Sequence, residues 1–303
     1  MSPSLSHYPV MVDEVVSFLK PKKNKIYLDG TFGQGGYSKR ILENTESTVF
    51  AIDRDNESYE YAKKFKKKYG SRFIFKKEKF SNINLLLKQQ KIKSFDGIVL
   101  DLGVSNTQLN NPLRGFSFSK EGPLDMRMDI QNEKLTAEIV INEYNEKELS
   151  DIFFYYGEER NSRRIAKAII NYRKTKRISS TKILSDIISK INNNKFKHPA
   201  TRVFQALRIF INEELNELEK VLQLSLKTLD INSRIIVVAF HSLEDRIVKN
   251  FFRDNSKKQI DKSLNKNIKN FKIITKKPIT PSDKELKENP RSRSAKMRVA
   301  EKQ

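Results

Sequence analysis

The sequence predicts an α/β protein in which a doubly wound parallel sheet is interrupted by an inserted all-helical domain. Short apolar runs alternate with helical stretches between residues 26 and 101, the alternation stops over residues 107–200, and an apolar run returns at 234–240. Parallel strands that are buried on both faces read as such continuous apolar runs. We therefore expect one domain from residues 1–106 and 213–303, and an inserted helical domain from residues 107–212.

The first part of the chain is predicted to hold one helix and four strands. The helix covers 10–19, where three valines and Leu19 share one side. The strands are expected at 26–28, 49–52, 73–75 and 98–100. Open α/β sheets bind ligands at the carboxyl ends of their strands. A ligand site is therefore expected where three of these strands end in acids, at Asp29, Asp53 and Asp101.

Helices dominate the prediction for the middle of the chain. Three are expected, at 146–156, 158–173 and 181–191, the last with Ser180 or Thr181 as its N-cap. One long helix is predicted from Phe204 to Leu229, because apolar residues recur there every three or four positions. The strand at 234–240 follows. Residues 255–277 are expected to form an exposed loop, with closing strands at 271–275 and 296–300, the last antiparallel.

Composition narrows the classes of function. The net charge of +22 indicates a polyanionic partner or, equally, a general bias toward Lys and Asn. The absence of Cys excludes disulfides and thiolate chemistry, and with three His we expect no metal site. The first nine residues lack the pattern of a signal peptide, and the longest apolar run, 235–240, is too short to cross a membrane. We therefore expect a soluble, cytoplasmic protein.

The sharpest local feature is a glycine-rich loop that runs from Asp29 to Ser38, between a strand and a helix. Glycines let such a loop turn tightly and approach a ligand closely. Asp53 follows about twenty residues after the first glycines, where an acid accepts hydrogen bonds from ribose hydroxyls. These features fit a nucleoside-bearing cofactor, either NAD or S-adenosylmethionine (AdoMet). The missing third dinucleotide glycine favours AdoMet, as does Asp29, which is placed to orient a methionine amine through the loop. The fold is then a Rossmann-like class I AdoMet methyltransferase sheet.

Motifs over almost the whole chain extend this interpretation. They are His7–Val10 with Glu14, Asp29–Gly36, Ala51–Asp55, Asp96–Ser105, Arg114–Phe118, Gly122–Asp129, Tyr156–Arg160, His198–Arg202, Phe204–Arg208, Phe240–Val248 and Asn289–Ser294. In this order they resemble the bacterial ribosomal-RNA cytosine-N4 methyltransferases, the RsmH or MraW family. The resemblance implies methyl transfer from AdoMet to the exocyclic N4 of cytosine 1402, at the decoding centre of 16S rRNA in the small ribosomal subunit. It also implies that the helical insertion recognises the substrate.

The same resemblance assigns the cofactor site. It implies that AdoMet is contacted by Gly35, Gly36, Tyr37, Asp53 at the ribose, Phe80 and Asp101 near the adenine, and Gln108. The chain departs from the family pattern at Tyr37, where His is usual, and at Asn106-Thr107, where Ser-Pro is usual. Tyr keeps a polar atom and a flat face for the cofactor. A proton-handling role of that His cannot be carried over.

The lone pair of the cytosine amine is delocalised into the ring, which makes the amine a poor nucleophile. A hydrogen-bond acceptor beside the amine would help to localise this lone pair. The candidates are Asp101, for which a turn or N-cap role is the less favoured alternative, the polar groups of Ser105-Asn106, and His241, for which a helix cap is an equal alternative. The target base must leave its stack. Candidates for stacking and phosphate contact are Phe116, Phe118, Arg202, Arg208 and Arg246.

Three other functions compete with this interpretation. An NAD-dependent oxidoreductase is disfavoured by the glycine spacing, and a non-catalytic RNA-binding protein by the intact Asp53 and Asp101. An enzyme that methylates amines of DNA bases would carry an Asp/Asn-Pro-Pro-aromatic motif, whereas this chain has Asp101-Leu-Gly-Val at the comparable position.

Overall fold

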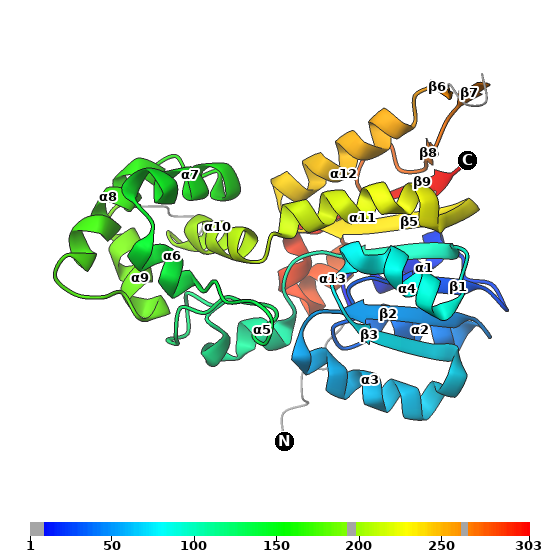
Figure 1. Ribbon diagram of the computed structural model, residues 1–303, viewed down its shortest axis with the longest axis horizontal. Coiled ribbons are helices and arrows are strands. Elements are labelled where there is room, and N and C mark those ends of the chain that lie inside the picture. Colours follow the sequence, from blue (N-terminus) through cyan, green and yellow to red (C-terminus); the bar gives the residue numbers. More distant parts are fainter. Residues whose placement is uncertain (1–8, 193–197, 262–265) are drawn as a thin grey trace. The chain divides into compact units, whose positions relative to one another are not determined.

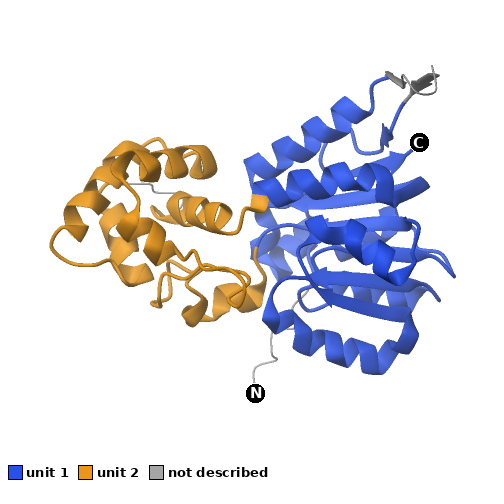
Figure 2. Cartoon of the chain, in the orientation of Figure 1, with its two compact units in different colours: residues 1–103, 215–303 blue, residues 104–214 orange. Residues whose placement is uncertain are grey.

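The computed structural model describes residues 9–192, 198–261 and 266–303. The chain divides into two compact units (Figure 2), one of residues 1–103 and 215–303 (unit 1) and one of residues 104–214 (unit 2). The sequence-based boundaries, 106/107 and 212/213, lie two or three residues from these divisions. Each unit has a hydrophobic core of its own.

Unit 1 is built on a seven-stranded sheet in the order β3-β2-β1-β4-β5-β9-β8 (Figure 1). Strands β1 to β5 run parallel to one another, and β9 runs antiparallel to both β5 and β8. This order and the antiparallel strand are those of a class I methyltransferase sheet, so the predicted fold class is confirmed. The strands are β1 (Ile26–Asp29), β2 (Thr48–Asp53), β3 (Phe73–Lys77), β4 (Phe95–Asp101), β5 (Leu229–Ala239), β8 (Phe271–Ile273) and β9 (Lys296–Lys302).

Helices cover both faces of the sheet because successive strand residues point to opposite sides. In β4, Val99 packs into one core and its neighbours Ile98 and Leu100 into the other. The core of Val99 is closed by α1 (Val12–Leu19), α2 (Gly36–Asn44) and α3 (Asn56–Tyr69). The other core is closed by α4 (Ile83–Gln90), α11 (Glu214–Thr228) and α12 (Ser242–Asn255).

Unit 2 is helical, and its core is formed by residues such as Phe153, Ile165 and Leu184. The three helices expected from the sequence are present, although α8 begins at Ser162 rather than 158. Ser180 caps α9, since its side chain accepts a hydrogen bond from Ile183 N. The helices of this unit are α5 (Asn106–Asn110), α6 (Ala137–Glu143), α7 (Glu146–Gly157), α8 (Ser162–Arg173), α9 (Thr181–Ser189) and α10 (Thr201–Ile211).

The prediction of one long helix over 204–229 is wrong. Helix α10 ends at Ile211 and α11 starts at Glu214, with Glu213 in the left-handed region at φ 51°. Asn212 causes the break, because its buried side chain accepts from Met128 N (2.7 Å) and donates to Met126 O (2.8 Å). The apolar stripe that looked continuous serves two cores, that of unit 2 before the break and that of unit 1 after it.

The predicted loop over 255–277 is also partly wrong. Strand β6 (Gln259–Asp261) pairs antiparallel with β7 (Lys266–Ile268), and β8 follows at once. A short helix, α13 (Asp283–Glu288), precedes β9 and was not anticipated. Within the described ranges, no helix combines the length and the apolar character that crossing a bilayer requires.

Candidate active site

The glycine loop joins β1 to α2 and is shaped by two glycines in the left-handed region. Gly33 has φ 53° and Gly35 has φ 82°, where other residues are strained. A Cβ atom on Gly35 would lie 2.4 Å from Cζ of Phe65, and one on Gly36 would lie 2.6 Å from Cβ of Pro9. The packing of the protein itself therefore requires glycine at positions 35 and 36.

Asp29 fixes the loop from inside. Its Oδ2 accepts from Ser38 Oγ (2.6 Å) and Ser38 N (3.2 Å), and its Oδ1 accepts from Thr31 N (3.3 Å). Burial raises the pKa of Asp29 to about 6, although these hydrogen bonds oppose the shift. The residue has no exposed surface, so it can act on a ligand only through the loop that it holds.

Asp53, at the end of β2, also binds the loop but keeps free acceptor capacity. Its Oδ2 accepts from Gly33 N (2.6 Å) and its Oδ1 from Asp55 N (2.8 Å). Burial raises the pKa of Asp53 to about 6. A carboxylate oxygen has two lone pairs, so each oxygen can accept one further hydrogen bond, as a ribose diol would require.

Asp101, at the end of β4, is tied to the same loop by its backbone. Its N–H donates to Thr31 Oγ1 (2.7 Å), whereas its Oδ1 is buried and has no hydrogen-bond partner among the described residues. Burial raises the pKa of Asp101 well above its usual range, and the carboxylates of Asp29, Glu244 and Glu285 add to this shift. The Tyr37 hydroxyl opposes this shift through a hydrogen bond to the Asp101 carboxyl group. A buried carboxylate with one oxygen left without a donor, among other acids, favours a cation as its partner.

Tyr37, in the first turn of α2, connects this edge to the N-terminal segment. Its hydroxyl donates to Val10 O (2.5 Å) and lies beside the carboxyl group of Asp101. The side chain is only 3% exposed, and burial raises the pKa of Tyr37 well above its usual range. The expected flat face for a cofactor is therefore not open, and the phenol instead holds Val10 over the start of α2.

Phe80 and Gln108 are fixed locally. Phe80 is half-buried after β3, and its Cβ atom would lie 3.8 Å from a Cβ atom on Gly30, the first glycine of the loop. Gln108 belongs to unit 2, where it forms a capping box with Ser105 at the start of α5. Its Oε1 accepts from Ser105 N at 2.8 Å.

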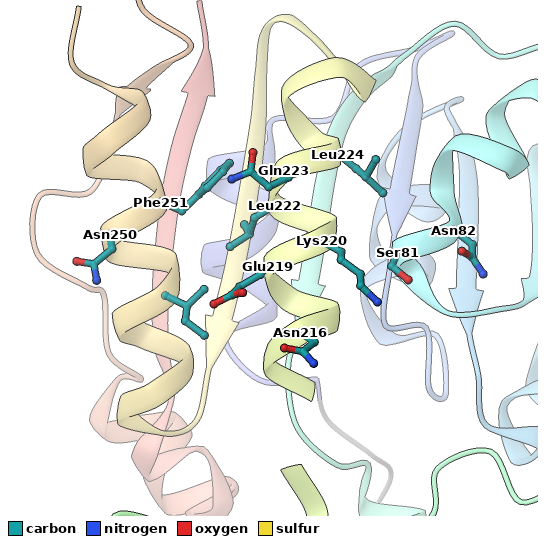
Figure 3. Close-up of a pocket in the computed structure, with 11 residues that line it drawn as sticks. Ser81, Asn82, Asn216, Glu219, Lys220, Leu222, Gln223, Leu224, Asn250 and Phe251 are labelled. Carbon is teal, nitrogen blue, oxygen red and sulfur yellow. The ribbon is translucent and has the colours of Figure 1, made fainter. Parts of the chain in front are cut away.

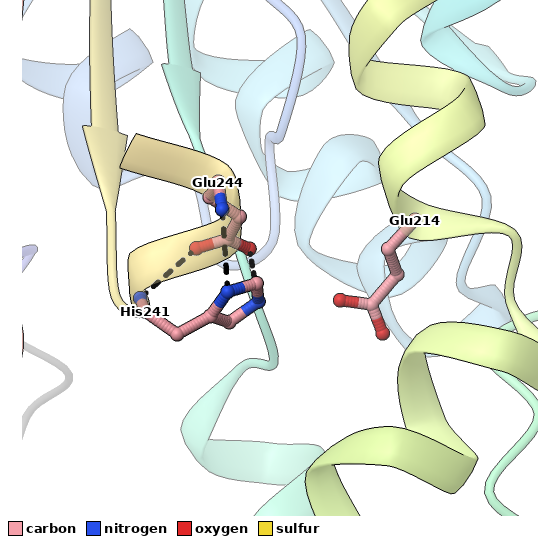
Figure 4. A group of neighbouring side chains, drawn as sticks. All are labelled: Glu214, His241 and Glu244. Atoms are coloured by element: carbon pink, nitrogen blue, oxygen red, sulfur yellow. Dashed lines mark hydrogen bonds and ion pairs between the residues drawn. The ribbon is translucent and has the colours of Figure 1, made fainter. Parts of the chain in front are cut away.

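His241 caps α12, the role that the sequence left as an equal alternative to catalysis. Its Nδ1 accepts from Glu244 N (3.3 Å), and Glu244 Oε2 accepts from Phe240 N (2.8 Å) and His241 N (3.3 Å). Its Nε2 lies 3.1 Å from Glu244 Oε1 (Figure 4). Both ring nitrogens thus face the first turn of the helix, and the geometry supports a structural role.

Of the residues expected to stack on a base or contact phosphates, some are buried or already paired within the protein. Phe116 is buried, whereas Phe118 stacks on His198 with ring centroids 4.3 Å apart. Arg208 is held by Glu214 through two hydrogen bonds of 2.9 Å, so an intramolecular carboxylate already occupies the guanidinium. Arg202 and Arg246 are exposed. His7 lies outside the described residues.

A groove of about 760 Å³ lies along α11 and α12 and reaches the residues just before α4 (Figure 3). It is lined by residues that include Asn216, Lys220 and Phe251, and by Ser81 and Asn82 directly after Phe80. None of the predicted site residues lines this groove, so it is separate from the acidic loop edge.

Comparisons with known proteins find a family and several relatives for this chain. The sequence model of the MraW methylase family matches residues 4–303. A Rickettsia bellii protein named ribosomal RNA small subunit methyltransferase H is 51% identical over 306 residues, 98% of either chain. The protein of that name from Rickettsia conorii is 50% identical over 305 residues, 97% of either chain. An rRNA methylase structure from Streptococcus thermophilus aligns with 96% of this chain and 93% of its own, at 8% identity and a TM-score of 0.43.

Proposed function

Since this chain belongs to the MraW methylase family, we propose that it transfers a methyl group from AdoMet to the exocyclic N4 of cytosine 1402 in 16S rRNA. The names of its relatives support the small ribosomal subunit as the source of the substrate. One structural observation carries the choice of cofactor. The buried, unpaired Oδ1 of Asp101 stands at the loop edge, next to three further carboxylates.

This acidic edge suits AdoMet better than NAD. AdoMet bears a positive sulfonium and an ammonium group, both of which a cluster of carboxylates attracts. A dinucleotide would instead bring its pyrophosphate to the start of the helix after the loop. There the carboxylates of Asp29 and Asp101 would repel it.

The proposed cofactor site uses the residues of the resemblance, with roles adjusted to the geometry. The backbone of Gly35, Gly36 and Tyr37 contacts AdoMet, Asp53 accepts from the ribose, and Phe80 with Asp101 borders the adenine and methionine ends. The family resemblance also assigns Gln108 to the cofactor. AdoMet supplies an electrophilic methyl group on a sulfonium.

The contribution of the protein to the reaction is mainly positioning. The cytosine amine is a weak nucleophile, and holding it in line with the methyl group lowers the barrier. The unpaired Oδ1 of Asp101 is the proposed acceptor, which orients the amine and receives a proton late in the reaction. The target cytosine must be unstacked for this contact. In this proposal residues 1–106 and 213–303 hold AdoMet, and residues 107–212 recognise the RNA.

Labelled methyl transfer tests this function. Small subunits from a strain that lacks its own enzyme would be incubated with the protein and methyl-labelled AdoMet, and the 16S rRNA mapped by mass spectrometry. We expect a single labelled cytosine with the methyl on N4, and strongly reduced transfer by Asp101→Asn. RNA binding without transfer would favour the non-catalytic alternative, and a methyl on a ring carbon would exclude an N4 enzyme.

A further inference from the structure

The outer face of α8 carries a stripe of cations with no acidic partners. Arg163, Arg164 and Lys167 lie on α8 at positions i, i+1 and i+4, while Arg160 stands in the turn before the helix and Lys174 at its C-cap. All five are exposed, and within the described part of the chain none of them makes an ion pair. The opposite face of α8 is buried in the core of unit 2. The stripe is therefore a fixed, uncompensated row of positive charge.

Two exposed aromatic residues lie at the adjoining end of α7. Phe154 is 54% exposed and Tyr155 is 64% exposed, with ring centroids 5.3 Å apart. Of the large apolar side chains that are exposed in the described ranges, these are the only two adjacent in sequence. Their burial would stabilise the protein, so their exposure indicates a binding surface.

A short turn, residues 158–161, joins α7 to α8 (Figure 1), so only a few residues separate the aromatic pair near the end of α7 from the start of α8. Glu159 is buried there, and its carboxylate accepts from Asn161 N (2.9 Å) and Asn192 Nδ2 (3.1 Å). The start of α8 also contacts α7 directly, because the hydroxyls of Ser150 and Ser162 are 3.3 Å apart. Ser150 lies one helical turn before Phe154, so the aromatic pair and the start of the stripe share one end of the hairpin.

A third helix adds a cation to this end. A Cβ atom on Gly157 would lie 2.6 Å from the carbonyl oxygen of Arg202, in the first turn of α10. The backbone of the exposed Arg202 therefore lies beside Gly157, the last residue of α7. A hydrogen bond from Gln205 Nε2 to Tyr156 O (3.3 Å) also links α10 to α7. The Tyr156–Arg160 and His198–Arg202 motifs thus meet at one surface.

We propose that this surface binds a single-stranded segment of RNA, with its phosphates along the α8 stripe and unpaired bases on Phe154 and Tyr155. The proposal rests on the proposed function, because it places the RNA contact on the unit assigned to substrate recognition. Cations spaced along a helix neutralise successive phosphates, and an exposed ring stacks on any base. A double-stranded segment would satisfy the cations but would offer no free base to the aromatic pair.

The test measures binding of a fluorescent single-stranded RNA of about 12 nucleotides by anisotropy at several salt concentrations. Replacing Arg163, Arg164 and Lys167 by Ala should weaken binding and flatten the logarithmic salt slope by about two. The double variant Phe154→Leu and Tyr155→Leu should weaken binding about tenfold at an unchanged slope, because it removes only stacking. Leu preserves the helix and the apolar area.

Matched controls separate this surface from net charge. Replacing Lys63, Lys64 and Lys67 of α3 by Ala removes the same charge from unit 1, and Leu113→Ala with Ile231→Ala removes exposed apolar groups elsewhere. Both controls should bind RNA nearly as the wild type does. The proposal would be overturned if the α3 and α8 variants lost equal RNA affinity, or if the Phe154→Leu and Tyr155→Leu variant bound RNA as the wild type does. It would also be overturned if polyglutamate displaced the labelled RNA as well as unlabelled RNA does. AdoMet binding and methyl transfer, measured separately, would show whether the proposed function itself had failed.

Discussion

Three aspartates end neighbouring strands, yet their hydrogen bonds give them different tasks. Asp29 receives three donors from the loop and has no exposed surface, so it builds the turn. Asp53 receives two backbone donors and retains acceptor capacity, so it links the loop to a ligand. The Oδ1 of Asp101 receives none from the described residues. Burial raises the pKa of all three, to about 6 for Asp29 and Asp53.

These raised pKa values predict a pH-dependent affinity for AdoMet. At low pH the carboxyl groups of Asp53 and Asp101 are protonated. A protonated Asp53 is a weaker acceptor for the ribose hydroxyls, and a protonated Asp101 cannot neutralise a cation. Affinity should therefore rise as pH increases through about 6 and continue to rise while Asp101 ionises. Calorimetry between about pH 5 and pH 7.5 measures this, and Asp101→Asn should remove the upper part of the rise. A flat profile would contradict the assignment.

The pH dependence of stability in the ligand-free protein runs in the opposite direction to that of AdoMet affinity. A carboxyl group whose pKa is higher in the folded state than in the unfolded state binds its proton more tightly when folded. The stabilisation that Asp29 and Asp53 contribute is thus complete below their unfolded pKa of about 4. It is lost as pH rises through about 6. AdoMet should offset part of this loss by pairing with the charges.

Asp53→Ala should weaken AdoMet binding by about 1–3 kcal/mol, because a charge-assisted hydrogen bond to the ribose is lost. Asp254→Ala is the matched control, since Asp254 is exposed and paired with Arg253. Calorimetry on both variants gives the difference. If Asp53→Ala bound AdoMet as tightly as the control does, the ribose assignment would be wrong.

At the scale of the elements, helix ends decide which side chains are available for chemistry. The capping box at α12 occupies His241 and Glu244, and that at α5 occupies Ser105 and Gln108. Both boxes stand directly after a strand or the loop that follows it, where the backbone turns back toward the sheet. His241, Ser105 and Gln108, which the sequence offered as candidates for the site, therefore form hydrogen bonds with backbone groups at the start of their own helices.

His241→Asn separates the capping and catalytic roles. Asn is a good N-cap, so the melting temperature and the rate of methyl transfer should stay near those of the wild type. His241→Ala should destabilise the protein by about 1 kcal/mol, a shift of roughly 2–4 °C in melting temperature. Normal stability of His241→Asn with a large fall in kcat would instead show that the imidazole takes part in the reaction.

Asn212→Ala should destabilise unit 2, because it leaves Met128 N and Met126 O without their buried partner. Each unsatisfied buried group costs about 1–3 kcal/mol, so the loss should exceed that of most point substitutions. Urea unfolding measures the change, with the exposed Asn44→Ala as control. A loss below about 1 kcal/mol would mean that the break between α10 and α11 does not depend on this side chain.

At the scale of the whole molecule, the chain has separate cores in its two units. Phe153, Ile165 and Leu207 belong to the core of unit 2, and the cores on the two faces of the sheet belong to unit 1. The groups proposed to hold AdoMet lie in unit 1, apart from Gln108. The net charge of +22 favours a polyanionic partner for the molecule.

Thermal unfolding should therefore occur in two transitions, one for each unit. Saturating AdoMet should raise the transition temperature of unit 1, because free AdoMet at a hundred times Kd stabilises the folded unit by about 2.7 kcal/mol. The transition of unit 2 should move much less. Differential scanning calorimetry with and without AdoMet tests this, and Asn212→Ala identifies the peak of unit 2. A single peak that shifts as a whole would show that the units unfold together.

The sequence by itself determined the sheet, its antiparallel strand, the helical insertion and the family. Apolar runs, acids at strand ends and a glycine loop are local patterns in the chain, and their order along it indicates the sheet and its ligand edge. The α10–α11 break could not be read in this way. The apolar spacing is the same on both sides of Asn212, and the two halves differ only in the core that they face.

The tertiary structure alone decided which polar side chains remain available. By type, Asp101 was the first candidate and His241 the second, with a helix cap as its equal alternative, while Asp29 was expected to act through the loop. In the structure Ser38 and Thr31 donate to Asp29, and Glu244 forms a capping box with His241. Hydrogen-bond partners come from distant parts of the chain, as Val10 does for Tyr37 and Thr31 for Asp101. Pairing is a property of distances in space, which a sequence pattern does not specify.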